Sequence, residues 1–195
     1  MKPYYQDDAV QIWYSTPSEA LAAVQDGKLD GSVNLSNRGL TALPNLTGVR
    51  VTGNFYCDGN RLTSLHGAPA HVGGSFYCDG NRLTSLQGAP ATVGGTFNCS
   101  GNRLTSLRGA PATVGGNFSC GYNRLTSLQG ASAHVGGDFY CSGNRLTSLR
   151  WAPATVGGYF YCYENPGRFT EADIKAAQQA SAICLSLLKI GRAHV

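Results

Sequence analysis

One motif is repeated six times along this chain at a spacing that never changes. Each copy carries a cysteine and, three residues later, an asparagine, and successive copies are 21 residues apart. These positions are Cys57, Cys78, Cys99, Cys120, Cys141 and Cys162, with Asn60, Asn81, Asn102, Asn123, Asn144 and Asn165. A fixed period of this length is typical of solenoids, in which every coil buries its apolar residues against its neighbours. The period therefore predicts a solenoid, although solenoids serve many functions.

A single copy shows how one coil is expected to fold. Phe76 and Cys78 alternate with polar residues and tyrosine, and this period of two predicts a short strand with one buried face. Asn81 follows where the chain must turn, and a buried amide there is expected to bond the backbone of its own and the next coil. Leu83 and Leu86 are expected to point inward. The Gly-Ala-Pro-Ala segment that follows is expected to be extended or a turn, because proline fixes φ and lacks a donor.

The six repeated cysteines are expected to form a column of small buried side chains. In-register parallel strands lie about 4.8 Å apart, whereas a disulfide needs Cβ atoms about 3.8 Å apart and a turned dihedral angle. Zinc-binding cysteines are usually about two to four residues apart, and no two cysteines of this chain are that close. We therefore interpret these cysteines as buried hydrophobic residues rather than as redox groups or metal ligands.

The repeated pattern F-x-C-x-x-N-x-L-x-x-L resembles the signature L-x-L-x-x-N-x-L of leucine-rich repeat proteins. The first coil, from Val33 to Pro44, is closer still, although Arg38 replaces its repeated asparagine. The short repeats are similar to the bacterial type that is also common in bacteriophage reading frames. The resemblance implies an α/β solenoid: a right-handed leucine-rich-repeat superhelix of about seven coils with a parallel β-sheet on its concave face. It also implies little helix within the repeats and a helical cap at each end.

Four segments are expected along the chain. An N-terminal helix is predicted at Thr16-Pro-Ser-Glu19, which is a capping box with proline at the first helical position. A C-terminal helix is predicted from Thr170, and each helix is expected to cover one end of the core. The segments are 1–30 with the N-terminal capping helix, 31–166 as the solenoid, 167–189 as the C-terminal capping helix, and 190–195.

The last segment has an unusual sequence. Ile-Gly-Arg-Ala-His-Val at 190–195 is the translation of ATC GGA AGA GCA CAC GTC, which resembles a standard sequencing adapter. We interpret 190–195 as an adapter artefact, and a genuine flexible terminus is the alternative. Neither interpretation gives these residues a function.

Composition limits the classes of function only weakly. The formal charge of +4 is mildly basic and does not by itself imply nucleic acid. The first residues lack the features of a signal peptide, and no apolar stretch is long enough to span a membrane. We therefore expect a cytoplasmic protein, or one exported without a visible signal peptide, and its oligomeric state is undefined.

The side chains between the buried strand positions are expected to face the concave surface. They vary from coil to coil and are rich in tyrosine, asparagine and serine, a composition that gives adaptable contacts at low entropic cost. We predict a protein-binding face with tyrosine anchors at its two ends. The alternative is that any soluble solenoid needs a polar exterior and tyrosine favours strands. The predicted binding residues are Tyr56, Asp58, Tyr77, Asp79, Asn98, Asp138, Tyr140, Tyr159, Tyr161 and Tyr163.

An arginine follows five of the repeated asparagines and is expected to form a stripe along one edge. The stripe consists of Arg61, Arg82, Arg103, Arg124 and Arg145. One hypothesis is that this edge binds nucleic acid or another polyanion. The alternative is that the arginine stems cover apolar surface while the charged groups stay in water. A third hypothesis is that the protein is a structural element of a phage or bacterial surface with no discrete ligand.

Enzymatic chemistry has little support in the sequence. No Ser/His/Asp set, metal-ligand cluster or phosphate-binding loop can be assembled with suitable spacing. His71 and His134 stand at one repeat position that is threonine in other coils, which indicates a variable surface. We therefore expect no catalytic residues, no metal site and no cofactor.

Overall fold

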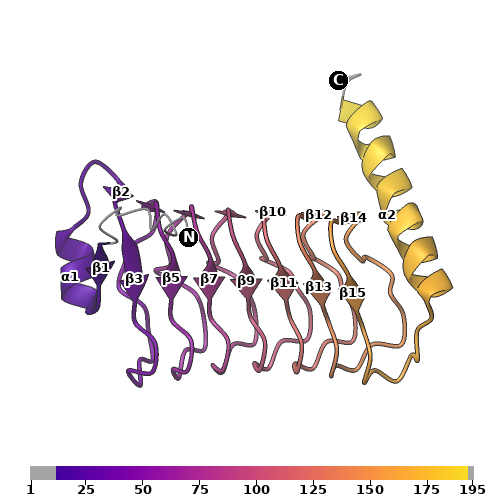
Figure 1. The fold of residues 1–195 in the computed structure, drawn as a ribbon, viewed down its shortest axis with the longest axis horizontal. Helices are drawn as coiled ribbons and strands as arrows, with labels where there is room; N and C mark the ends of the chain where they lie inside the picture. The colour runs from indigo at the N-terminus through magenta and orange to yellow at the C-terminus, as the bar shows by residue number, and fades with distance from the viewer. Residues whose placement is uncertain (1–11, 193–195) are drawn as a thin grey trace, which may run out of the picture.

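The computed structural model describes residues 12–192, with the side chains of the C-terminal helix described as far as Ala182. The chain winds into a parallel β-solenoid of about seven coils, and each coil contributes one strand to each of two sheets (Figure 1). The eight-stranded sheet contains β1 (Trp13–Tyr14), β3 (Ser32–Asn34), β5 (Phe55–Tyr56), β7 (Phe76–Tyr77), β9 (Phe97–Asn98), β11 (Phe118–Ser119), β13 (Phe139–Tyr140) and β15 (Phe160–Tyr161). The seven-stranded sheet contains β2 (Lys28–Leu29), β4 (Arg50–Val51), β6 (His71–Val72), β8 (Thr92–Val93), β10 (Thr113–Val114), β12 (His134–Val135) and β14 (Thr155–Val156).

The predicted alternation of buried and outward side chains is confirmed in the eight-stranded sheet. Neighbouring strands pair in parallel and in register, so that Phe76 lies between Phe55 and Phe97. These rings are fully buried, as are the cysteines two residues after them. The ring centroids of Phe55 and Phe76 are 5.4 Å apart, close to the spacing between the strands themselves. Identical residues therefore form continuous columns through the core.

The repeated asparagines form the predicted internal ladder. The Oδ1 atom of Asn81 accepts a hydrogen bond from the Leu62 amide at 3.0 Å. Its Nδ2 atom donates to the carbonyl oxygens of Cys57 at 2.9 Å and Cys78 at 3.1 Å. Each asparagine thus bonds its own coil and the preceding coil, whereas the sequence predicted bonds to its own and the next coil. In the first coil, the Arg38 amide donates to the Oδ1 atom of Asn60 at 3.0 Å.

The seven-stranded sheet was not predicted, because the segment after the leucines was expected to be only extended or a turn. Its valines lie in register, as in the pairing of Val72 with Val93. They are almost fully buried except for Val156 in the last strand, which is partly buried. A glycine pair follows each of five of its strands. The backbone of successive coils comes so close there that a Cβ atom at Gly94 would overlap the carbonyl oxygen of Gly73. Glycine is therefore required by backbone packing rather than by turn conformation.

Both predicted helices are present. In α1 (Pro17–Ala22), the Thr16 side chain accepts a hydrogen bond from the Glu19 amide, and the Glu19 carboxylate accepts from the Thr16 amide, as in a capping box. In α2 (Glu171–Arg192), Ile174 and Ala177 pack against the core. The C-terminal half of α2 extends beyond the edge of the solenoid (Figure 1).

The C-terminal helix is longer than predicted, and part of it lies beyond the described side chains. The helix continues to Arg192, three residues past the predicted end at 189. The apolar side chains predicted at Ile183, Leu187 and Leu188 lie outside the described side chains, and 193–195 lie outside the described residues altogether. Within the described chain, neither helix has the length and apolar composition that crossing a bilayer requires.

Candidate functional site on the eight-stranded sheet

The outer face of the eight-stranded sheet presents three parallel columns of side chains, which we call the tyrosine face. Strand register defines the central column, and the residues two positions before and after it on each strand form the flanking columns. The central column is Asn34, Tyr56, Tyr77, Asn98, Ser119, Tyr140 and Tyr161. The flanking columns are Ser32, Asn54, Ser75, Thr96, Asn117, Asp138 and Tyr159, and Ser36, Asp58, Asp79, Ser100, Gly121, Ser142 and Tyr163. The structure thus brings all ten predicted face residues onto one surface.

One aromatic cluster lies towards the N-terminal end of this face. The rings of Tyr56 and Tyr77 are parallel, with centroids 5.0 Å apart and an interplanar angle of 1°. The ring centroid of Trp13, on β1, lies 5.8 Å from that of Tyr56, so Trp13 extends the cluster. Trp13 was not predicted from the sequence, because a two-residue strand outside the repeats has no periodic signal.

A second aromatic cluster lies at the C-terminal end. Tyr140 and Tyr161 stack with ring centroids 4.6 Å apart. The ring centroids of Tyr159 and Tyr163 lie 6.0 Å and 6.3 Å from that of Tyr161. Tyr159 and Tyr163 are 72% and 59% exposed, so the last coil presents aromatic surface directly to solvent. Tyrosines are therefore concentrated at both ends of the face.

Two successive coils have no aromatic residue in the central column, and they separate the two clusters. Asn98 and Ser119 occupy these coils, and we call their two positions the polar gap. Tyr77 and Tyr140 border the gap, three inter-strand steps apart. At about 4.8 Å for each step, the backbone positions of the two tyrosines are about 14 Å apart.

The charged groups of the tyrosine face are carboxylates. Asp138 accepts hydrogen bonds from the Tyr140 hydroxyl and the Tyr159 amide, both at 2.7 Å, and these bonds lower the pKa of Asp138. The same hydroxyl bond raises the pKa of Tyr140 to about 12. Asp58 and Asp79 occupy adjacent coils, and burial, with a smaller contribution from the charge of Asp58, raises the pKa of Asp79.

The five arginines lie where the sequence predicted, in a column beside the ladder asparagines. Each arginine amide donates to a leucine carbonyl of the preceding coil, as Arg82 does to Leu62 at 2.9 Å. All five side chains are exposed. In the described part of the chain, the side-chain ion pairs join Lys28 to Asp30 and Lys175 to Glu171, and neither includes this column.

The cysteine column is buried, as predicted, and all six of its thiols are free. Several lie near a carbonyl oxygen of the next coil; the Cys99 Sγ atom is 3.4 Å from the oxygen of Ser119. Burial raises the pKa of each of these thiols. A buried thiol that resists ionisation is a poor nucleophile, so this column offers no reactive group.

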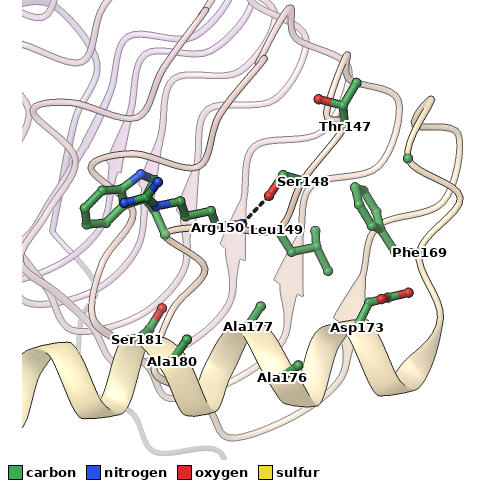
Figure 2. A pocket seen from close by; sticks show the side chains of 12 residues that line it. Thr147, Ser148, Leu149, Arg150, Phe169, Asp173, Ala176, Ala177, Ala180 and Ser181 are labelled. Atoms are coloured by element: carbon green, nitrogen blue, oxygen red, sulfur yellow. Dashed lines mark hydrogen bonds between the residues drawn. The ribbon is translucent and has the colours of Figure 1, made fainter.

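An open pocket of about 640 Å³ lies between α2 and the last coil, and Figure 2 shows Leu149 and Phe169 across from the helix. Ala177 and Ala180 line its helical side. The Arg150 guanidinium lies 4.9 Å from the centre of the Trp151 ring. The pocket was not predicted, because its shape depends on the angle at which α2 leaves the solenoid.

Among the residues that the structure describes, no cluster of three or more histidine, cysteine or acidic side chains is arranged to hold a metal ion. The sequence matches no protein-family model, and no curated protein or solved structure matches it. A functional assignment therefore depends on the residues of this chain alone.

Proposed function

We propose that this protein is a non-catalytic recognition scaffold that binds a protein partner through the tyrosine face. One observation carries the proposal: two tyrosine clusters stand on the same side of a continuous parallel sheet. Tyrosine supplies a large contact area and loses little side-chain entropy on binding, because it has only two rotatable side-chain bonds. Aromatic residues are also enriched among those that contribute most to protein interfaces.

The rigidity of the sheet supports this proposal. Buried phenylalanines precede Tyr56, Tyr77 and Tyr140 on their strands, and the ladder asparagines bond successive coils. The phenylalanine before Tyr161, in the last coil, is partly buried. The stacked rings of each pair also restrict one another. A surface that is ordered before it meets its partner spends less free energy on ordering during binding.

We also propose that the chain is a relative of the short leucine-rich repeat proteins of bacteria and bacteriophages, with the tyrosine face on the concave side of a right-handed superhelix. The paired leucines and the asparagine ladder of each coil support this relationship. We further propose that α1 caps the N-terminal end of the core. The complete burial of Ala20 among the core residues supports that role.

Binding of nucleic acid or another polyanion along the arginine column is a second candidate function. The observation that favours it is the regular spacing of five exposed arginines, none of which is paired with a carboxylate in the described structure. Such binding would weaken steeply with salt, because each neutralised phosphate releases counterions. A structural role in a phage or bacterial surface is the third candidate.

A capture experiment from bacterial lysate at moderate salt tests the proposal. The wild type is compared with a Tyr56→Ala, Tyr77→Ala, Tyr140→Ala variant and with an Arg61→Ala, Arg82→Ala, Arg103→Ala variant. We expect a discrete protein that the wild type and the arginine variant retain and the tyrosine variant loses. Nucleic acid lost only from the arginine variant would support the second candidate instead. Capture that neither variant changes would contradict both.

A further inference from the structure

We propose that the tyrosine face binds an extended peptide segment in which two arginines, separated by one residue, insert into the polar gap. This inference rests on the proposed function and specifies its partner class. Three independent features of the face carry it: the sign of its charge, the orientation of its rings and the width of the gap.

The charge of the face favours a cationic ligand. The whole chain has a formal charge of +4, yet the tyrosine face, over the columns that the structure describes, carries Asp58, Asp79 and Asp138 and no lysine or arginine. Asp58 and Asp79 stand one step apart beside the first tyrosine pair. A cation placed there would relieve their mutual repulsion, whereas the phosphates of a nucleic acid would add to it.

The orientation of the rings leaves two aromatic surfaces facing the gap. Parallel rings with centroids 5.0 Å apart must form an offset stack, because coplanar rings would collide at that separation. Tyr56 covers one face of Tyr77, and the opposite face is directed towards Asn98. By the same argument, Tyr161 covers one face of Tyr140, and its other face is directed towards Ser119. Neither gap residue is large enough to cover these rings.

The width of the gap selects the spacing of the ligand. Tyr77 and Tyr140 are about 14 Å apart along the sheet, as three inter-strand steps require. In an extended peptide running along the solenoid axis, side chains at i and i+2 point the same way and are about 7 Å apart. Two such side chains centred in the gap would each lie about 3.5 Å from a tyrosine ring. This is the distance of van der Waals contact between stacked groups.

Arginine fits this gap better than lysine does. Its guanidinium is planar and stacks on an aromatic face, while its hydrogen-bond donors remain directed sideways. Asn98 and Ser119 on the floor of the gap offer oxygen acceptors to those donors, and so do the carboxylates beside each tyrosine pair. Lysine has the charge but lacks the flat surface.

Fluorescence anisotropy with synthetic peptides tests the inference on the full chain. The probe is a labelled Gly-Ser-Arg-Thr-Arg-Ser-Gly peptide, and the matched control, Gly-Ser-Thr-Arg-Arg-Ser-Gly, has the same composition with adjacent arginines. We expect the first peptide to bind wild type at least about threefold more tightly than the second. The key variant is Ser119→Tyr, which fills the gap but leaves both tyrosine pairs and all three carboxylates in place. We expect it to weaken binding of the first peptide by about tenfold or more.

The Ser119→Tyr variant is expected to fold, because four coils already carry tyrosine at this position. An unfolding temperature close to that of the wild type would confirm it. Equal binding to wild type and Ser119→Tyr, or no preference between the two peptides, would overturn the inference. The inference would also be overturned if a single-stranded oligonucleotide bound the wild type but not the Ser119→Tyr variant.

The outcomes separate this inference from the proposed function. If neither peptide binds, but the tyrosine variant still loses a partner captured from lysate, the arginine inference fails and the protein-binding function stands. If peptide binding follows the expected pattern while lysate capture does not depend on the tyrosines, the ligand class of the face stands. The assignment of the captured partner to that face is then wrong.

Discussion

The asparagine ladder inside the solenoid and the tyrosine face outside it share one strand spacing but tolerate variation differently. Every ladder position from the second coil onwards is asparagine, and each of these side chains bonds two coils. The central column of the tyrosine face contains tyrosine, asparagine and serine in the same register. An interior group that satisfies buried backbone atoms has no substitute, whereas an outward side chain needs only to fit a strand. Specific recognition is therefore expected on the face.

The largest expected difference comes from replacing an asparagine in each region. Asn102 accepts a hydrogen bond from the Leu83 amide and donates to three carbonyls, those of Cys78, Cys99 and Ser100. Asn102→Ala leaves the buried Leu83 amide without a partner and removes one of the two hydrogen bonds that each of the three carbonyls accepts. We expect it to lower the free energy of unfolding by about 2–4 kcal/mol. Asn98→Ala removes one hydrogen bond, from the Ser100 amide, and is expected to cost about 1 kcal/mol or less. Urea unfolding measures both, and equal losses would contradict the contrast.

A glycine at the back of a coil gives the next largest effect. Gly94→Ala would place a methyl group against the Gly73 carbonyl oxygen, so two coils must move apart locally. We expect a loss of about 1–3 kcal/mol, typical of overpacking. Thr96→Ala, two residues further on at the tyrosine face, is the matched control and is expected to change stability by less than about 0.5 kcal/mol. Thermal unfolding compares the two variants, and a harmless Gly94→Ala would show that the coils can separate freely.

Two serines, one on each side of the coil, are expected to differ in what their hydroxyl groups contribute to stability. Ser132 stands where four other coils have proline, and its hydroxyl donates to the Pro111 carbonyl. Ser132→Ala is expected to cost about 1 kcal/mol. The hydroxyl of Ser142, on the tyrosine face, is buried without a partner among the described residues, so Ser142→Ala is expected to be neutral or stabilising. Denaturant midpoints of the two variants check this order, and a larger loss for Ser142→Ala would reverse it.

The smallest effect concerns the ionisation of Tyr140. The pKa of Tyr140 is raised to about 12 because its hydroxyl donates to Asp138, whereas an unfolded tyrosine has a pKa of about 10. The bond therefore contributes stability that is fully present below about pH 10 and is lost as pH rises through about 12. Asp138→Asn removes the charge, and we expect the pKa of Tyr140 to fall towards its ordinary value.

An ultraviolet absorbance titration measures that shift. With Asp138 intact, the titration curve of Tyr140→Phe is subtracted from that of the wild type, which leaves the contribution of Tyr140. The same subtraction is then made between two proteins that both carry Asp138→Asn, one with Tyr140 and one with Tyr140→Phe. Superimposable difference curves with and without the Asp138 carboxylate would show that its bond does not control the ionisation.

Much of the interior was predictable from sequence, because a strict period assigns the same environment to the same position in every coil. The burial of Phe76 and Cys78 and the bonding role of Asn81 follow from one copy of the repeat. The second sheet was missed because its two-residue strands are too short to show alternation. The constant spacing of Val72 and Val93 before each glycine pair was the available signal.

The sequence predicted which residues share the tyrosine face, but not how their side chains are arranged there. All ten predicted residues lie on one face, yet their order in the sequence does not reveal that the rings stack in pairs, since stacking depends on side-chain rotamers. The hydroxyl of Tyr140 turning to Asp138 likewise depends on rotamers. Trp13 entered the face through a strand outside the repeats, which no period could indicate.

The ladder asparagine bonds only its own coil and the coil before it, and this has an evolutionary consequence. Duplicating or deleting one 21-residue unit inside the array leaves every remaining interior contact with an equivalent partner. Such an event near Asn98 would move the two tyrosine pairs apart or together by one step of about 4.8 Å. The spacing of the two tyrosine pairs can therefore change by whole units in a single genetic event. Under the proposed function, such a change would alter the spacing of ligand groups that the face accepts, while the core stays the same.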